Sequence, residues 1–130
     1  MTIAHMRVFA ILAGGAVGAL ARAGVARAVP TAPGHWPWAT FSVNIAGALI
    51  LAWLTTRLTE IVAPALYWRF LLGTGFCGAL TTFSTFQIEV IKLARHGQPA
   101  LAAAYAGASI AAGLAAAIVA TLVARRRRYG

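Results

Sequence analysis

An uncharged run at residues 70–88 constrains the fold of this chain more than any other feature. The run is long enough to cross a bilayer, yet its centre reads Gly75-Phe-Cys-Gly-Ala-Leu-Thr-Thr-Phe-Ser-Thr-Phe86, with glycines and hydroxyls where lipid favours leucine. Because glycine and threonine both weaken helices, we expect the backbone to open between Gly75 and Thr82. Carbonyls freed at membrane depth are tolerated where they bind an ion or are buried in protein.

The composition predicts an all-α membrane protein with a single domain over residues 1–130. Hydrophobic residues make up 61% of the 130 positions, charged residues make up 10%, and the mean hydropathy is +0.80. A spanning helix needs about 20 apolar residues. The windows that meet this requirement are about 8–29, 38–56, 70–93 and 99–124, followed by a basic tail at 125–130.

The net charge of +9 is concentrated partly in the tail Arg125-Arg-Arg-Arg128. A basic run can bind nucleic acid, but one that directly follows an apolar helix is more typical of an anchor to anionic lipid headgroups. We therefore predict membrane lipid as a partner and no nucleic acid. Cys77 is the only cysteine, so the chain has no internal disulfide.

The N-terminal segment has two interpretations. An apolar stretch after Arg7, ending in Ala19-Leu-Ala21, imitates a secretory signal with a cleavage site. Against cleavage, Gly14, Gly15 and Gly18 place small residues on one face, as in a helix that packs against others in a membrane. We expect the first helix to be retained.

Hydrogen-bond donors lie within several of the predicted spans. The amide of Asn44 is costly in lipid unless it is paired, so it either joins helices or faces a pore. Tyr105 and Ser109 are four residues apart and share a helix face, where their hydroxyls either extend a line of donors or bond neighbouring carbonyls. The complete set of predicted donors is Asn44, Ser84, Thr85, Tyr105 and Ser109.

No carboxylate is expected deep within a span, because Glu60 falls in a predicted loop and Glu89 near the end of the third span. A lining of donors without carboxylates suits an anion better than a cation or a proton relay. The histidines His5, His35 and His96 all fall at ends or in loops. With no metal-ligand cluster and no nucleophile beside a base, we predict that the chain is not an enzyme.

Phe83 and Phe86 are three residues apart and therefore share one helix face. Two phenylalanines at this spacing are usually core residues, but their positive ring edges could also stabilise a small anion in a narrow path. Arg22 either reaches the lipid headgroups or sets a positive potential at a vestibule. Because four helices enclose little space, a water-lined path predicts an oligomer.

The segment Gly75 to Phe86 quoted above is accompanied by Val43-Asn-Ile-Ala-Gly47 and Gly14-Gly-Ala-Val-Gly-Ala-Leu-Ala-Arg22. Together these motifs strongly resemble the Fluc (CrcB) family of fluoride channels over nearly the whole chain. The resemblance implies a fluoride-selective channel in the bacterial inner membrane that exports fluoride passively and gives resistance to its toxicity. It also implies an antiparallel, dual-topology homodimer with two pores, a broken third helix in each chain and a structural sodium ion at the centre.

The resemblance assigns roles to individual positions. The positions that match the family's fluoride pore are Phe83, Phe86, Asn44, Tyr105 and Ser109, with Ser84 and Thr85 beside them. Gly78 and Thr81 match the carbonyl donors to sodium, and Arg22 matches the vestibule arginine. Ala79 departs from the family, which usually has a second glycine there, and its methyl group would tighten packing near the sodium ion.

Two other functions fit a chain of this size. A small multidrug exporter also packs four short helices, but it needs a membrane-embedded carboxylate for proton exchange, and the first helix here has none. A non-transporting membrane subunit held by small-residue contacts would move no ions in liposomes.

The basic residues give only a weak orientation signal. With four spans, one side holds seven basic residues, namely Arg7, Arg57, Arg69 and Arg125 to Arg128. The other side holds four, namely Arg22, Arg27, Lys92 and Arg95. Without the tail the count is three against four, so we predict insertion in both orientations.

Overall fold

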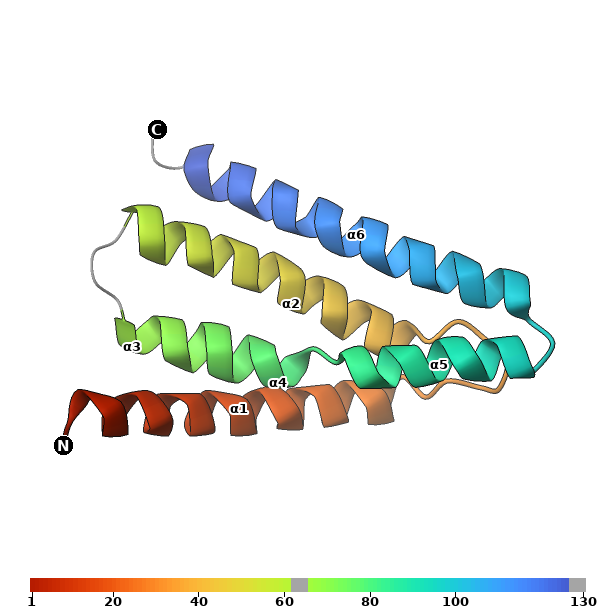
Figure 1. The fold of residues 1–130 in the computed structure, drawn as a ribbon, viewed down its shortest axis with the longest axis horizontal. Coiled ribbons are helices and arrows are strands. Elements are labelled where there is room, and N and C mark those ends of the chain that lie inside the picture. The colour runs from red at the N-terminus through yellow and green to blue at the C-terminus, as the bar shows by residue number, and fades with distance from the viewer. Residues whose placement is uncertain (62–65, 127–130) are drawn as a thin grey trace.

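The computed structural model describes residues 1–61 and 66–126, in which every regular element is a helix (Figure 1). Within those residues three helices are long and apolar enough to cross a membrane. They contain α1 (Ile3–Ala28), α2 (Trp38–Thr56) and α6 (Pro99–Arg126). The all-helical membrane class predicted from composition is therefore confirmed.

Two helix boundaries differ from those predicted. The first helix begins at Ile3, before the predicted window, because the hydroxyl oxygen of Thr2 accepts the backbone N–H of His5 at 3.4 Å and caps the helix. The second helix continues into a wider π-helical turn, η1 (Arg57–Ile61), so Glu60 lies on a helix and not in a loop. The rest of the turn predicted at 59–64, and the tail beyond residue 126, lie outside the described residues.

The third apolar window is not one long helix. It contains α3 (Leu66–Trp68), the π-helical η2 (Arg69–Cys77), the turn α4 (Gly78–Leu80) and α5 (Phe83–Arg95). Between α4 and α5, Thr81 and Thr82 have extended backbones, with φ/ψ of −84°/156° and −149°/123°. These residues form the thin connection between the two helices in Figure 1.

Glycines let α1 lie directly against η2 and α4. A Cβ atom at Gly14 would overlap the carbonyl of Leu71, and one at Gly18 would overlap the carbonyl of Phe76. In return, a Cβ atom at Gly75 would lie 2.7 Å from the carbonyl oxygen of Ile11. The small-residue face predicted for the first helix therefore contacts the first half of the third window.

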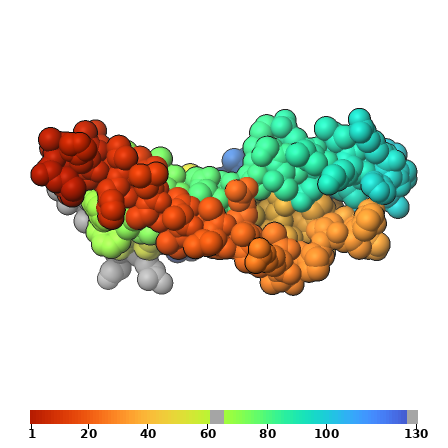
Figure 2. Space-filling model, turned by 90° about the horizontal axis from the view of Figure 1, so that it is seen from below, coloured from red at the N-terminus to blue at the C-terminus, as the bar shows by residue number. Residues whose placement is uncertain are grey.

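Most of α5 lies beyond the end of α1, and only its first turn, at Thr85, lines a hollow together with α1. Figure 2 shows the two helices at opposite ends of the same face. On the other side α5 packs against α6 around a small core of Leu93, Ala102 and Tyr105, which is joined by Trp36 and Phe86. The second half of the third window is therefore held by α2 and α6.

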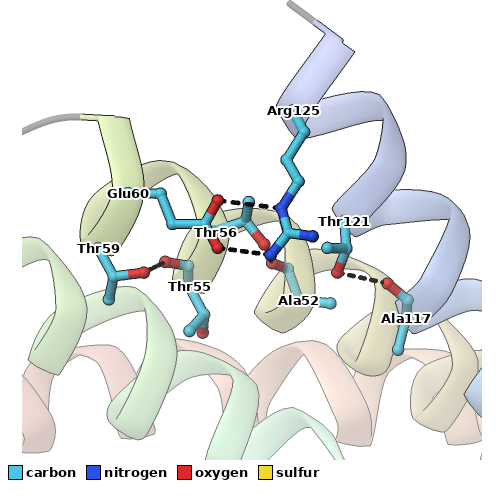
Figure 3. Close-up of polar contacts among 8 residues, drawn as sticks. All are labelled: Ala52, Thr55, Thr56, Thr59, Glu60, Ala117, Thr121 and Arg125. Carbon is cyan, nitrogen blue, oxygen red and sulfur yellow. Dashed lines mark hydrogen bonds and ion pairs between the residues drawn. The ribbon is translucent and has the colours of Figure 1, made fainter. Parts of the chain in front are cut away.

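The N-terminus and the last described turn of α6 lie at the same end of the molecule (Figure 1). There the guanidinium of Arg125 donates to both carboxylate oxygens of Glu60, at 3.0 and 2.7 Å (Figure 3). The two side chains are 54% and 35% exposed. Because water screens such a pair, it contributes at most about 1 kcal/mol in joining α6 to η1.

The glycine contact generates a stability prediction. Gly18→Ala places a methyl group against the Phe76 carbonyl, so the backbones must separate, at a cost of about 1–3 kcal/mol. We expect the protein purified in detergent to lose its folded, soluble form at a lower temperature, as followed by size-exclusion chromatography after heating. Gly24→Ala is the control, because nothing lies within 4 Å of its added Cβ atom. Equal midpoints for the two variants would contradict the packing.

Candidate functional site

The side chain of Asn44 pairs with the backbone of Thr82 between α4 and α5. Its amide nitrogen donates to the carbonyl oxygen of Thr82 at 3.0 Å, and its amide oxygen accepts the N–H of Thr82 at 2.8 Å. This double hydrogen bond pairs both backbone groups of a buried residue where helical bonding stops. Asn44 therefore joins α2 to the third window, which is one of its two predicted roles.

The same pairing redirects the hydrogen bonds of the chain. In a continuous helix the N–H of Thr82 would bond the carbonyl of Gly78, but here it is donated to Asn44. The N–H of Thr85 would bond the carbonyl of Thr81, but it is donated to the Thr82 hydroxyl oxygen at 3.2 Å. The carbonyls of Gly78 and Thr81 are therefore among those that lose their helical donors at this break.

The hydroxyl of Thr82 links two predicted donors. It donates to the Thr85 hydroxyl at 3.1 Å and lies 3.4 Å from the Ser84 hydroxyl. The sequence analysis did not single out Thr82. A threonine placed directly before the first residue of a helix is an N-cap signature, and this signal could have identified it.

Glu89 lies closer to the donors than the sequence predicted. Its carboxylate accepts the Thr40 hydroxyl at 2.7 Å and the Tyr105 hydroxyl at 2.7 Å. The prediction of a donor lining without carboxylates was wrong at Glu89, because its carboxylate accepts the hydroxyl of one of the predicted donors, Tyr105. The reason is that α5 begins only at Phe83, which places Glu89 in mid-helix on the side held by α2 and α6.

Phe83 and Phe86 form a stacked pair, with ring centroids 5.9 Å apart and an interplanar angle of 29°. Phe86 is partly buried and its ring centroid lies 5.3 Å from that of Tyr105, but Phe83 is 69% exposed. In such a stack the positive ring edges point outward from the pair. Phe83 is therefore not a core residue of this chain. The pair lines an open hollow of about 630 Å³ together with Ser84 and Gln87.

Arg22 lines a second hollow of about 240 Å³ that also reaches Thr40, Thr82 and Thr85. Its side chain is partly buried and shares this hollow with hydroxyl groups. Ser84 and Thr85 are neighbours in α5 but line different hollows. The two predicted donors therefore do not share one continuous surface within a single chain.

Ser109 lies one turn beyond Tyr105 on α6. Its hydroxyl oxygen is buried and has no hydrogen-bond partner within residues 1–61 and 66–126. Such a group costs free energy unless a water, an ion or another chain completes it. In the same ranges, no three histidine, cysteine, aspartate or glutamate side chains are placed to hold a metal ion.

Residues 9–121 match the family described as CrcB-like protein, Camphor Resistance (CrcB). A relative from Mycobacterium bovis named fluoride-specific ion channel FluC 1 is 51% identical over 117 residues, covering 90% of this chain and 89% of its own. Another from Acidobacterium capsulatum, named fluoride-specific ion channel FluC, is 38% identical and covers 82% and 86%. One from Yersinia pestis, also named FluC 1, is 40% identical over 72% and 74%. The chain is a multi-pass membrane protein and belongs to the CrcB family, which is a family of ion channels and not of enzymes.

Proposed function

We propose that this chain is a fluoride-selective channel that exports fluoride passively and so gives resistance to fluoride toxicity. The observation that carries the proposal is the exposed stack of Phe83 on Phe86 beside the hydroxyls of α5, in a chain whose relatives are named fluoride-specific channels. A ring that is 69% exposed contributes little to the core of one chain. It is available to line a path.

Fluoride is compact and strongly hydrated, so a selective path must replace its water with donors in a bore too narrow for larger halides. Phe83 and Phe86 supply positive ring edges, and Asn44 has a second amide hydrogen beyond the one given to Thr82. The remaining proposed donors are Ser84, Thr85, Tyr105 and Ser109. The Tyr105 hydroxyl is donated to Glu89, so it serves fluoride only when it turns away from that carboxylate.

We further propose that two chains assemble antiparallel in the bacterial inner membrane, forming a dual-topology homodimer with two pores. The hollow beside Phe83 is open on one side, and a second chain would close it into a path. Large apolar side chains such as Ile88 and Ile91 continue this exposed surface along α5. The weak charge bias of the loops permits insertion in both orientations.

We place a sodium ion on the dimer axis, where it would bind backbone carbonyl oxygens at the interruption of the third window. Gly78 and Thr81 are two of the residues whose carbonyls lose their helical donors at the break, and carbonyl oxygens suit a hard cation. Two such oxygens from each chain would surround one ion. The positive charge of the ion would offset the negative end of each opened helix. Ala79 lies between them in sequence, and its methyl group would tighten the packing near the ion.

The central test of the function is fluoride efflux from liposomes, followed with an ion-selective electrode and compared with chloride. We expect fluoride flux with strong rejection of chloride. Phe83→Ile and Phe86→Ile preserve apolar volume but remove the ring edges, and should each lower fluoride flux at least about ten-fold. Ile118→Val is the control, because Ile118 lies on α6 and does not line the hollow beside Phe83. An equal chloride leak would disprove selectivity, and parental flux in both phenylalanine variants would make these rings packing residues only.

The sodium proposal predicts a stability that depends on the cation. In sodium chloride the parent oligomer should withstand heating to a temperature about 5 °C or more above that in choline chloride. Asn44→Ala should abolish this difference, because the N–H of Thr82 is then free to return to the Gly78 carbonyl. Thr81→Val is the control. It removes the hydroxyl that donates a hydrogen bond to the Cys77 carbonyl oxygen, but it keeps the Thr81 carbonyl. A parent that is insensitive to sodium would overturn the site.

The antiparallel dimer predicts that the C-terminus is found on both sides of the membrane. A cysteine added after Arg128 in a Cys77→Ala background should react with an impermeant thiol reagent from either face of sealed vesicles. Labelling of inside-out and right-side-out vesicles measures the two populations separately. Reaction from one face only would mean a fixed orientation and would exclude the antiparallel dimer.

A further inference from the structure

We propose that the indole N–H of Trp36 is a further fluoride donor, at the end of the path nearest the loop before α2. The proposal rests on the fluoride channel proposed above and extends its line of donors by one residue. It assigns a binding role to an aromatic side chain that the sequence analysis left without one.

The first observation is an unpaired donor. The indole nitrogen of Trp36 is buried and, like the hydroxyl of Ser109, has no hydrogen-bond partner in the described part of the chain. A hydroxyl can either donate or accept a hydrogen bond, but an indole N–H can only donate. A buried donor of this kind needs an acceptor from outside the chain.

The second observation is the place of the ring. Trp36 packs edge-to-face on Tyr105, with ring centroids 5.4 Å apart and an interplanar angle of 79°. Tyr105 in turn lies 5.3 Å from Phe86, which stacks on Phe83. The indole therefore continues an unbroken series of aromatic contacts from the stacked pair. Ser109, the other unpaired donor, is one turn from Tyr105 on α6.

The third observation is the charge around this end of the series. His35 and Pro37, the chain neighbours of Trp36, line a hollow of about 280 Å³ together with Glu89 and Lys92. Lys92 supplies a positive charge that attracts an anion toward the hollow. Glu89 would repel an anion, but its oxygens already accept hydroxyls from Thr40 and Tyr105. Trp36 itself does not line this hollow, so an anion drawn into it would reach the buried N–H by passing between His35 and Pro37.

The first test removes the N–H and keeps an aromatic ring. Trp36→Phe in the full-length protein in liposomes should lower fluoride efflux about ten-fold, as expected for the loss of one hydrogen bond to an ion. Trp38→Phe is the matched control, because Trp38 is a neighbour in the same aromatic cluster but is 57% exposed. If the parent conducts fluoride and Trp36→Phe conducts it at the same rate, this inference is overturned and the proposed function stands.

The second test reads binding directly and does not depend on conduction or on the folding of Trp36→Phe. In a Trp38→Phe, Trp53→Phe, Trp68→Phe protein, Trp36 is the only tryptophan. Its ¹⁵N-labelled indole N–H resonance in detergent should move on addition of sodium fluoride and stay in place with sodium chloride. A resonance that fluoride does not move would overturn the inference, whatever the flux. If the parent passes no fluoride, the proposed function fails, and a fluoride-specific shift would still support Trp36 as a binding donor.

Discussion

The double hydrogen bond between Asn44 and Thr82 is the interaction on which the rest of the site depends. A membrane-spanning backbone must have its polar groups satisfied, so where a helix opens in mid-span another group has to take over that task. One amide does so here for both backbone groups of Thr82. The break sets the start of α5 at Phe83, and it leaves the carbonyls of Gly78 and Thr81 without their helical donors.

Glycine contacts on one side and a polar cluster on the other hold the two halves of the third window apart. Gly14 and Gly18 allow η2 and α4 to approach α1 so closely that added Cβ atoms would overlap backbone. The second half is tied elsewhere, because Glu89 accepts hydroxyls from Thr40 on α2 and Tyr105 on α6. The second half of the third window also lines the open hollow beside Phe83, together with Ala106 of α6.

Much of the fold could be predicted from the sequence because bilayer physics leaves few options. Apolar length predicted the long helices, and small-residue spacing predicted the contact of the first helix. The pairing of Glu89 could not be predicted, because it depends on Thr40, which lies 49 residues away in the chain, and on where α5 begins. Glu60 was misplaced in a loop because a π-helical extension leaves no clear composition signal. The roles in conduction of all the predicted pore residues, and the sodium site at Gly78 and Thr81, stay predictions.

The central claim is that Asn44 holds the third span open and so exposes two carbonyls to a bound cation. An experimental density map of the purified protein in sodium chloride tests it most directly. The account predicts the Asn44 amide against the backbone of Thr82, an interruption before Phe83, and a density peak between the Gly78 and Thr81 carbonyls of two chains. A continuous helix, in which the N–H of Thr82 bonds the Gly78 carbonyl and Asn44 points elsewhere, would contradict it.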